Sequence, residues 1–292
     1  MKFFIARNRN MQMNSHLKGL LLVFGLGAIP LHAQQTNELL LHVNGPVSIL
    51  EYDGVDNKVA LDDGVGFGIE FGRYLSTKWS LRTGVALQTY RGNAKLDVIN
   101  GAYLTQDSEA EAFEFRYRFI DYRETQTARY IQIPLLAQYE TSGTNRLFAS
   151  AGVKLGILAE SQYEAEATRL TTAGYYEQYD ALLEAPRFAG FGNFGSYSWE
   201  AEDLALKTNV MLSVETGLKL PVTQSSLVYL SVYLDYGLTN VFDDTNSNRL
   251  LEYNAAPEVN FTGNSVLTTQ AGNVDKIKTL SFGFKLKYGF GF

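Results

Sequence analysis

The 292-residue sequence contains no cysteine. This absence excludes a disulfide framework, a thiolate zinc site, a cysteine nucleophile and a lipidated cysteine. Proline is scarce at 6 residues, and tryptophan is scarcer at 2. Basic residues are also in deficit, since 25 Lys and Arg stand against 31 Asp and Glu. Nucleic-acid-binding proteins normally carry a basic face, so we expect no nucleic-acid partner.

Long apolar runs are missing as well. No segment after residue 33 has about 18 consecutive apolar residues, so no transmembrane helix is expected. The apolar run 19–31 follows a basic segment without acidic residues and ends just before Ala33. These features predict a cleaved signal peptide at residues 1–33, with an uncleaved membrane anchor as the less favoured alternative. Met1, Met11 and Met13 are all candidate translation starts.

The mature chain, 34–292, shows strict alternation of apolar residues with polar or small ones. In 280–292 every second residue is Leu, Phe or Tyr, and the residues between are Ser, Gly or Lys. Successive side chains of a strand point to opposite faces, so each such segment predicts a strand with one apolar face. Eight segments follow this pattern: 39–49, 65–72, 79–88, 131–139, 147–157, 212–220, 228–237 and 280–292.

The connections between these segments alternate between short and long. Tight turns are expected at 76–78, 141–144 and 222–225. Long polar connections are expected near 92–127, 162–206 and 241–277, with a shorter one at 53–62. Short turns at one end and long loops at the other are typical of outer-membrane barrels with an even number of strands. The pattern predicts an all-β fold: an eight-stranded antiparallel transmembrane up-and-down β-barrel over 34–292, with short periplasmic turns and long extracellular loops.

A soluble lipocalin-like barrel or a β-sandwich would show the same alternation with its apolar face turned inward. Glycine recurs on the non-apolar face, which suits a narrow barrel interior. The apolar faces end in Tyr90, Tyr139, Tyr236 and Tyr288, like the aromatic girdles of membrane barrels, and the chain ends on Phe292. We therefore expect the chain in the cell outer membrane, in contact with lipid and lipopolysaccharide.

The C-terminal strand resembles an outer-membrane assembly signal, in which a polar residue and a glycine precede two spaced apolar or aromatic residues. Ser281, Gly283, Leu286 and Tyr288 match this signal, and Phe292 is the terminal aromatic residue. Placement of the signal on Phe292 itself does not fit, because Lys287 stands where glycine is expected. The resemblance implies that the barrel assembly machinery of the outer membrane is a partner of this chain.

Four blocks, 68–85, 129–140, 148–160 and 235–244, resemble the PorT-like outer-membrane β-barrel family, which is similar to the porin family. The resemblance covers most of 63–292 outside the long connections. It implies an eight-stranded outer-membrane barrel of a Gram-negative bacterium. Some members of that family are accessory parts of a protein-secretion and gliding apparatus, and most have no known activity, so the resemblance leaves the role open.

The interior of an eight-stranded barrel is only wide enough for its own side chains. Charged residues on the non-apolar faces are expected to point into it. Unpaired buried charges are costly, so we expect these residues to form ion pairs that fill the lumen, with a narrow ion path as the less favoured alternative. The expected residues of this network are Glu70, Arg82, Lys154, Glu215, Lys219, Asp235, Lys285 and Lys287.

No catalytic site, metal site or cofactor is expected. His42 is the only histidine of the mature chain, and it lies near the start of the first strand. A histidine-based catalytic set at the extracellular rim therefore cannot be built from this sequence. Histidine clusters suited to metal binding and glycine-rich phosphate loops are also missing from the sequence.

The long connections are strongly acidic and rich in aromatic residues. Together with residues 160 and 161 they hold 24 acidic and 9 basic residues, and 162–206 alone contains nine aromatic residues. Two roles remain open for them. Tyrosine and tryptophan supply contact area for a protein partner, so the loops predict an interaction surface. Alternatively, they form a hydrated cap that repels lipopolysaccharide phosphates or is bridged to them by divalent cations.

Overall fold

The computed structural model describes residues 36–53, 56–57, 64–202, 204–243, 249–255 and 260–292, so the expected signal peptide at 1–33 lies outside the described residues. No helix in these ranges is long and apolar enough to cross a membrane. The described elements are β1 (Asn37–Tyr52), β2 (Asp56–Asn57), β3 (Gly66–Tyr74), β4 (Trp79–Gln106), β5 (Ala112–Glu140), β6 (Arg146–Tyr176), η2 (Glu177–Tyr179), β7 (Ala181–Leu183), η3 (Arg187–Ala189), β8 (Gly192–Glu202), β9 (Asn209–Pro221), β10 (Ser226–Gly237), β11 (Leu251–Asn254), β12 (Asn260–Gly263), η4 (Val266–Thr268) and β13 (Ile277–Gly291).

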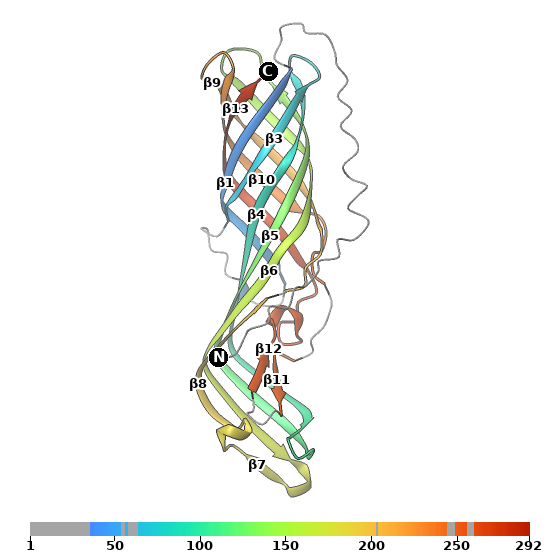
Figure 1. The fold of residues 1–292 in the computed structure, drawn as a ribbon, viewed down its shortest axis with the longest axis vertical. Coiled ribbons are helices and arrows are strands. Elements are labelled where there is room, and N and C mark those ends of the chain that lie inside the picture. The colour runs from blue at the N-terminus through green and yellow to red at the C-terminus, as the bar shows by residue number, and fades with distance from the viewer. Residues whose placement is uncertain (1–35, 54–55, 58–63, 203, 244–248, 256–259) are drawn as a thin grey trace, which may run out of the picture. The chain divides into compact units, whose positions relative to one another are not determined.

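Eight of the described strands close into a barrel, in the order β1, β3, β4, β5, β6, β9, β10 and β13 (Figure 1). Each ring neighbour is also the next barrel strand along the chain, and the ladders between ring neighbours are antiparallel. The ring closes between the first and last strands, where β1 pairs with β13 from Glu38↔Gly291 to Tyr52↔Ile277. The eight-stranded up-and-down barrel expected from the alternation is confirmed.

The tight turns lie at one end of the barrel, which we call the short-turn end. They connect β3 to β4, β5 to β6 and β9 to β10. Both ends of the described chain meet there, because the backbone N–H of Thr36 donates to the carbonyl oxygen of Phe292 at 3.1 Å. The long connections therefore share the opposite end, as the sequence predicts.

The apolar face of the barrel strands points outward. Leu41, Leu135 and Phe284 are 59%, 60% and 72% exposed, respectively. An apolar band of this kind is a liability in water but suits lipid, because the closed ladders satisfy the backbone polar groups. The soluble alternative, with its apolar face inward, is therefore wrong. The expectation that Tyr90 belongs to an outward-facing aromatic girdle is also wrong, because its side chain is completely buried inside the barrel.

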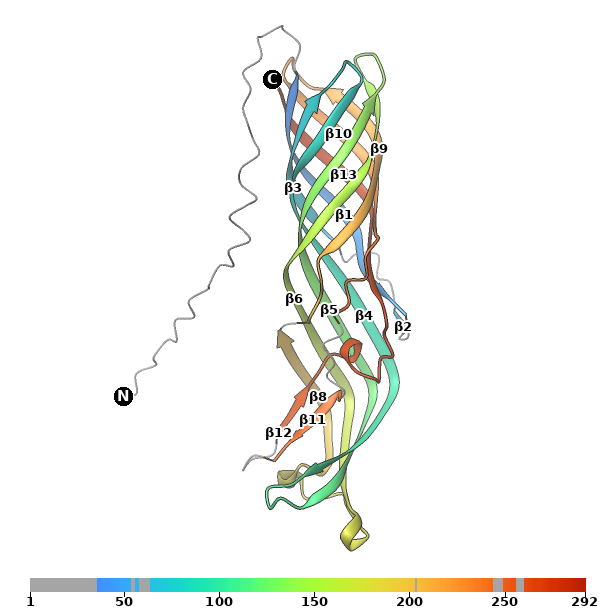
Figure 2. The same cartoon turned by 90° about the vertical axis from the view of Figure 1, so that its right-hand side faces the viewer.

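Three adjacent strands continue far beyond the barrel. β4, β5 and β6 contain 28, 29 and 31 residues, whereas a membrane crossing needs about ten (Figure 2). Together with β7 and β8, which pair with β6, the continuations form what we call the projecting sheet: residues 91–106, 112–129, 160–176, 181–183 and 192–202. The expectation that 92–127 and 162–206 are loops is wrong for most of their length.

An aligned irregularity lies in the middle of the projecting sheet. Asp97, Asp121 and Thr168 are left out of the ladders at the same level, and the register on either side is unchanged. Asp121 has a φ of 51°, in the left-handed region. On β5 the buried positions are odd up to Phe119 and even from Tyr122 onward. An extra residue in each strand, as in a β-bulge, therefore changes whether odd or even positions point inward, while the strands remain paired.

Candidate functional site

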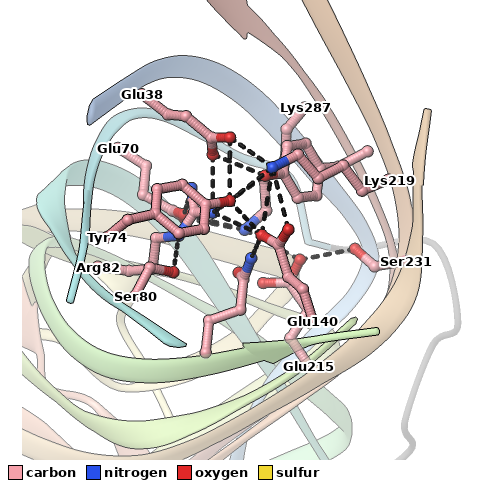
Figure 3. Close-up of polar contacts among 12 residues, drawn as sticks. Glu38, Glu70, Tyr74, Ser80, Arg82, Glu140, Glu215, Lys219, Ser231 and Lys287 are labelled. Atoms are coloured by element: carbon pink, nitrogen blue, oxygen red, sulfur yellow. Dashed lines mark hydrogen bonds and ion pairs between the residues drawn. The ribbon is translucent and has the colours of Figure 1, made fainter. Parts of the chain in front are cut away.

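The structure places the charged residues expected in the lumen inside the barrel, where all eight are buried. The largest group lies near the short-turn end and surrounds Arg82 (Figure 3). Arg82 Nη2 lies 2.7 Å from Glu38 Oε2 and 3.4 Å from Glu140 Oε1. Lys219 Nζ lies 2.5 Å from Glu38 Oε1 and 3.1 Å from Glu140 Oε2. Two cations thus share two carboxylates.

Tyrosine hydroxyls add hydrogen bonds to this group. The Tyr229 hydroxyl donates to Glu38 Oε2 at 2.6 Å and accepts from Arg82 Nη2 at 3.0 Å. The Tyr74 hydroxyl donates to Glu140 and accepts from Lys219 Nζ at 2.5 Å. Buried charges are costly when their remaining donors and acceptors are unsatisfied, and the two hydroxyls reduce this cost at the centre of the group. Arg82 Nη1 still has no hydrogen-bond partner among the described residues.

A second group continues along the lumen away from the short-turn end. Lys287 Nζ lies between Glu70 Oε2 at 2.9 Å and Glu215 Oε1 at 3.0 Å. Lys285 Nζ contacts the other oxygen of Glu215 at 3.1 Å. Arg82 Nη1 links the two groups through Glu70 Oε1 at 3.7 Å. Further along, Lys154 and Asp235 form a separate pair at 2.6 Å.

Sequence reasoning missed two members of this network, Glu38 and Glu140. With them, the lumen network of the described residues holds five acidic residues and five buried basic ones, and the partly exposed Arg146 adds a further ion pair to Glu140 at 3.2 Å. Both residues were detectable, because each continues the alternation of its strand by one step: Glu140 follows Gln138, and Glu38 shares the parity of His42. They were left out because Glu140 is the last residue of β5, before a turn, and Glu38 lies at the start of β1.

Neutral polar side chains lie beside these charged residues, since Lys285 Nζ is 5.0 Å from the ring centroid of Tyr233. Asn44 donates to Gln88 at 2.8 Å and to the Tyr233 hydroxyl at 3.0 Å, and Gln88 donates to Ser48 at 2.7 Å. The mouth at the long-loop end is then covered by an apolar layer of buried side chains. This layer includes Tyr90, Tyr130, Leu204, Leu206, Met211, Val241, Val266, Leu267 and Ile277. Ion pairs and an apolar cover therefore lie in series along the barrel axis.

The hydrophobic core continues from the mouth of the barrel into the projecting sheet. Phe113, Phe115 and Phe119 on β5 are almost fully buried against the β11–β12 hairpin and the end of β8. Phe115 contacts Tyr253 at a ring-centroid distance of 5.1 Å, and Phe119 contacts Trp199 at 5.5 Å. Aromatic pairs at these distances stabilise the contact beyond the area they bury. The projecting sheet is thus a folded unit rather than a set of loops.

This core corrects the expectation of an aromatic loop surface. Of the nine aromatic residues in 162–206, most lie inside. Three are buried and three more pack partly buried against the core: Tyr163, Tyr176, Phe191, Phe194, Tyr197 and Trp199. Tyr179 and Phe188 remain at the tip, 62% and 80% exposed. Most of these aromatic residues thus stabilise the interior of the projecting sheet, and few are exposed for contact with a partner.

A buried carboxylate joins the projecting sheet to the mouth of the barrel. Glu124 on β5 accepts hydrogen bonds from Gln126 Nε2 at 2.8 Å and from the backbone N–H of Val266 at 2.7 Å, and also from the hydroxyls of Tyr122 and Ser265. No lysine or arginine of the described ranges pairs with it. Burial raises the pKa of Glu124 by more than its four donors lower it.

The residues of the expected assembly signal lie on both faces of β13. Ser281 is buried in the lumen, where its hydroxyl hydrogen-bonds with that of Ser48 at 2.6 Å. Leu286, Tyr288 and Phe292 point outward toward lipid. Gly283 has a φ of 146°, and a Cβ there would stand 2.0 Å from the carbonyl oxygen of Gly45. Within the described ranges, no group of three or more His, Asp or Glu residues could hold a metal ion.

The match to a protein-family model agrees with the barrel. A family model described as "Outer membrane protein beta-barrel domain" matches residues 33–243, well over half of the chain. None of the curated proteins compared with this chain matches it. Among solved structures, the attachment invasion locus protein Ail of Yersinia pestis is 10% identical, with a TM-score of 0.28, over 88% of this chain and 97% of its own. Neisserial surface protein A is 11% identical, with a TM-score of 0.32, over 89% of this chain and 98% of its own. OprG from Pseudomonas aeruginosa is 13% identical, with a TM-score of 0.33, over 88% of this chain and 96% of its own.

Proposed function

We propose, from the premise that this chain belongs to the outer membrane protein beta-barrel domain family, that it is a membrane anchor for a rigid binding sheet. As a member of that family the chain is a protein of the cell outer membrane. The long loops of such barrels face the cell exterior, so the projecting sheet would stand outside the cell. The role is one of interaction and does not involve catalysis.

The observation that carries this proposal is the unbroken continuation of three barrel strands into a folded sheet. β5 pairs with both β4 and β6 from the short-turn end to the far tip, with only a few ladder positions left out. Flexible loops would suffice for a barrel that only spans the membrane. A projecting sheet with an aromatic core instead holds side chains in fixed positions, as a binding surface requires.

The filled lumen argues against the narrow-channel alternative. A conducting path would need mobile water along the axis, but ten charged side chains are tied into ion pairs there and the apolar layer covers the mouth. In planar bilayers we therefore expect no single-channel steps from the purified protein. Reproducible steps would favour the channel over the anchor.

The test of a binding role is photo-crosslinking in living cells. A crosslinking amino acid replaces Phe188 or Leu104, which are 80% and 73% exposed on the projecting sheet. Matched controls replace Leu135 or Phe284, which are exposed on the barrel toward lipid. We expect discrete adducts only from the first two positions. Adducts that are the same from all four positions, or from none, would contradict a binding surface on the projecting sheet.

An accessory role in a secretion apparatus is the second candidate. It is favoured by the four blocks that resemble the PorT-like family, including the block 129–140 in β5. The crosslinking experiment separates it from the first candidate. A secretion subunit would yield the same partner proteins at fixed stoichiometry, including partners reached from the periplasmic turns such as 141–145.

A further inference from the structure

The outer face of the projecting sheet carries an ordered grid of side chains around two arginines. Asn100 on β4, Arg118 on β5 and Thr171 on β6 are register partners across the three strands. The next row toward the tip holds Ala102, Arg116 and Ala173. These residues line a depression of about 410 Å³, with Glu184 also contributing to its lining. The small side chains on both sides of Arg116 leave this space open.

The arginines of this region differ in how they are neutralised. Arg116 pairs with Glu114, and its guanidinium lies 4.8 Å from the ring centroid of Tyr175. For Arg118 and the neighbouring Arg169, no carboxylate of the described ranges lies within ion-pair distance. Arg169 lies opposite Ile120, one row from Arg118. Arg118 is therefore the unneutralised guanidinium in the lining of the depression, and Arg169 lies outside the lining, one row away.

Other arginines on the same face show the contrast. Arg129 Nη1 lies 2.6 Å from Glu160 Oε2, and Arg123 Nη1 lies 3.8 Å from Glu166 Oε1 on β6. Those two are neutralised across the strand pair, as exposed arginines on a sheet commonly are. Arg118 differs from these two arginines because no carboxylate of the described residues lies within ion-pair distance of it, while the lining also contains the carboxylate of Glu184.

We propose that this depression binds a saccharide that carries a sulfate or phosphate ester. Arginine is suited to such a group because its planar donors match two oxygens at once. Asn100, Thr171 and the carboxylate of Glu184 would accept from or donate to sugar hydroxyls. A bare inorganic anion fits less well, because Glu184 would repel it. This inference rests on the proposed role of the projecting sheet as a binding surface.

The position of the depression bears on the source of the saccharide. Arg118 precedes the lipid-facing residue Ile131 by thirteen positions on β5, which corresponds to about 40 Å of strand. Phosphates at the membrane surface lie at the level of the barrel rim. The depression would therefore meet the outer sugars of lipopolysaccharide or a glycan from outside the cell, which share the ester chemistry.

The test measures binding of dextran sulfate to the full-length protein in phospholipid nanodiscs, with unmodified dextran and inorganic phosphate as companion probes. We expect binding of dextran sulfate only. Arg118→Gln and Arg169→Gln should each weaken it about tenfold, because a charge-assisted hydrogen bond is lost. Arg129→Gln is the matched control: it removes the same charge from the same strand and should change affinity less than about twofold.

Two results would overturn the inference. If Arg129→Gln and Arg118→Gln weakened the affinity for dextran sulfate equally, the polymer would be held by diffuse attraction to positive charge and not by a site. Equal competition by inorganic phosphate, with no effect of Glu184→Gln, would mean that no sugar is recognised. Nanodiscs containing lipopolysaccharide then separate the sources: loss of dextran sulfate binding supports a site filled by the membrane's own saccharide, and unchanged binding supports a foreign one. Absence of dextran sulfate binding ends this inference but leaves the crosslinking test of the projecting sheet unaffected.

Discussion

Glu124 on β5 accepts a hydrogen bond of 2.7 Å from the backbone N–H of Val266, which is 142 positions later in the chain. This contact ties the segment that covers the barrel mouth to the base of the projecting sheet. Val266 and Leu267 are buried beside it in the apolar layer. The contact therefore joins the two features on which the proposed function depends, the closed mouth and the rigid sheet.

The first prediction concerns the pH dependence of this contact. Because the pKa of Glu124 is raised above 4.5, the folded protein binds a proton more readily than the unfolded chain. The stability of the projecting sheet should then be greatest below about pH 4.5 and fall as pH rises through the raised pKa. Glu124→Gln, which resembles the protonated acid, should flatten this dependence.

The readout for this prediction is Trp199 fluorescence during thermal unfolding. Trp79→Phe leaves Trp199, in the core of the projecting sheet, as the only tryptophan of the mature chain. Glu164→Gln, an exposed carboxylate on β6, is the control and should keep the wild-type pH profile. A profile that stays steep in Glu124→Gln would assign the dependence to another group.

The second prediction concerns the separate lumen pair, Lys154 and Asp235, whose charged atoms lie 2.6 Å apart. Asp235→Asn leaves a buried lysine without its counter-charge and should cost about 3–5 kcal/mol of unfolding free energy. Lys154→Met together with Asp235→Leu should cost less than either single change. Urea unfolding from lipid vesicles, followed by Trp79 in a Trp199→Phe background, measures the double-mutant cycle. Additive effects of the two changes would show that the pair is not coupled.

The third prediction concerns Gly263, at the end of β12. A Cβ at this position would stand 2.2 Å from the indole of Trp199, so the ring must move. Gly263→Ala should destabilise the projecting sheet by about 1–3 kcal/mol and shift Trp199 emission to longer wavelength. Gly156→Ala is the comparison, because its Cβ would come no closer than 3.1 Å to the flexible end of Met211 and 3.3 Å to the Tyr130 ring. Similar behaviour of the two variants would mean that Trp199 repacks freely.

The fourth prediction separates folding from recognition in the expected assembly signal. Gly283 adopts a φ of 146° beside the Gly45 carbonyl, so Gly283→Ala should prevent refolding even in pure detergent. Tyr288→Ala removes an exposed side chain and should refold in detergent but assemble more slowly in cells. Heat-modifiable gel mobility measures both. If Tyr288→Ala also failed to refold in detergent, slow assembly in cells would be no evidence that Tyr288 is recognised by the assembly machinery.

Several features of this protein could be predicted from the sequence because strand periodicity is local. The alternation of apolar with polar or small residues in 280–292 identifies a strand, whatever that strand packs against. The short turns locate the strand ends. The projecting sheet was equally visible in 113–119, where Phe and Tyr alternate with Glu and Arg. It was missed because the inward residues of β5 are odd-numbered before Asp121 and even-numbered after it. The two halves of β5 therefore do not form one continuous alternation.

The sequence by itself determined which side chains share a face of each strand, and hence the eight-stranded barrel and the charged lumen. Tertiary structure alone decided which charges neutralise one another, because partners such as Lys287 and Glu70 lie 217 positions apart. It also decided that most aromatic residues of the long connections point inward and that no carboxylate of the described residues pairs with Arg118. Alternation is a property of one strand, whereas pairing and burial depend on strands that only the closed ring brings together.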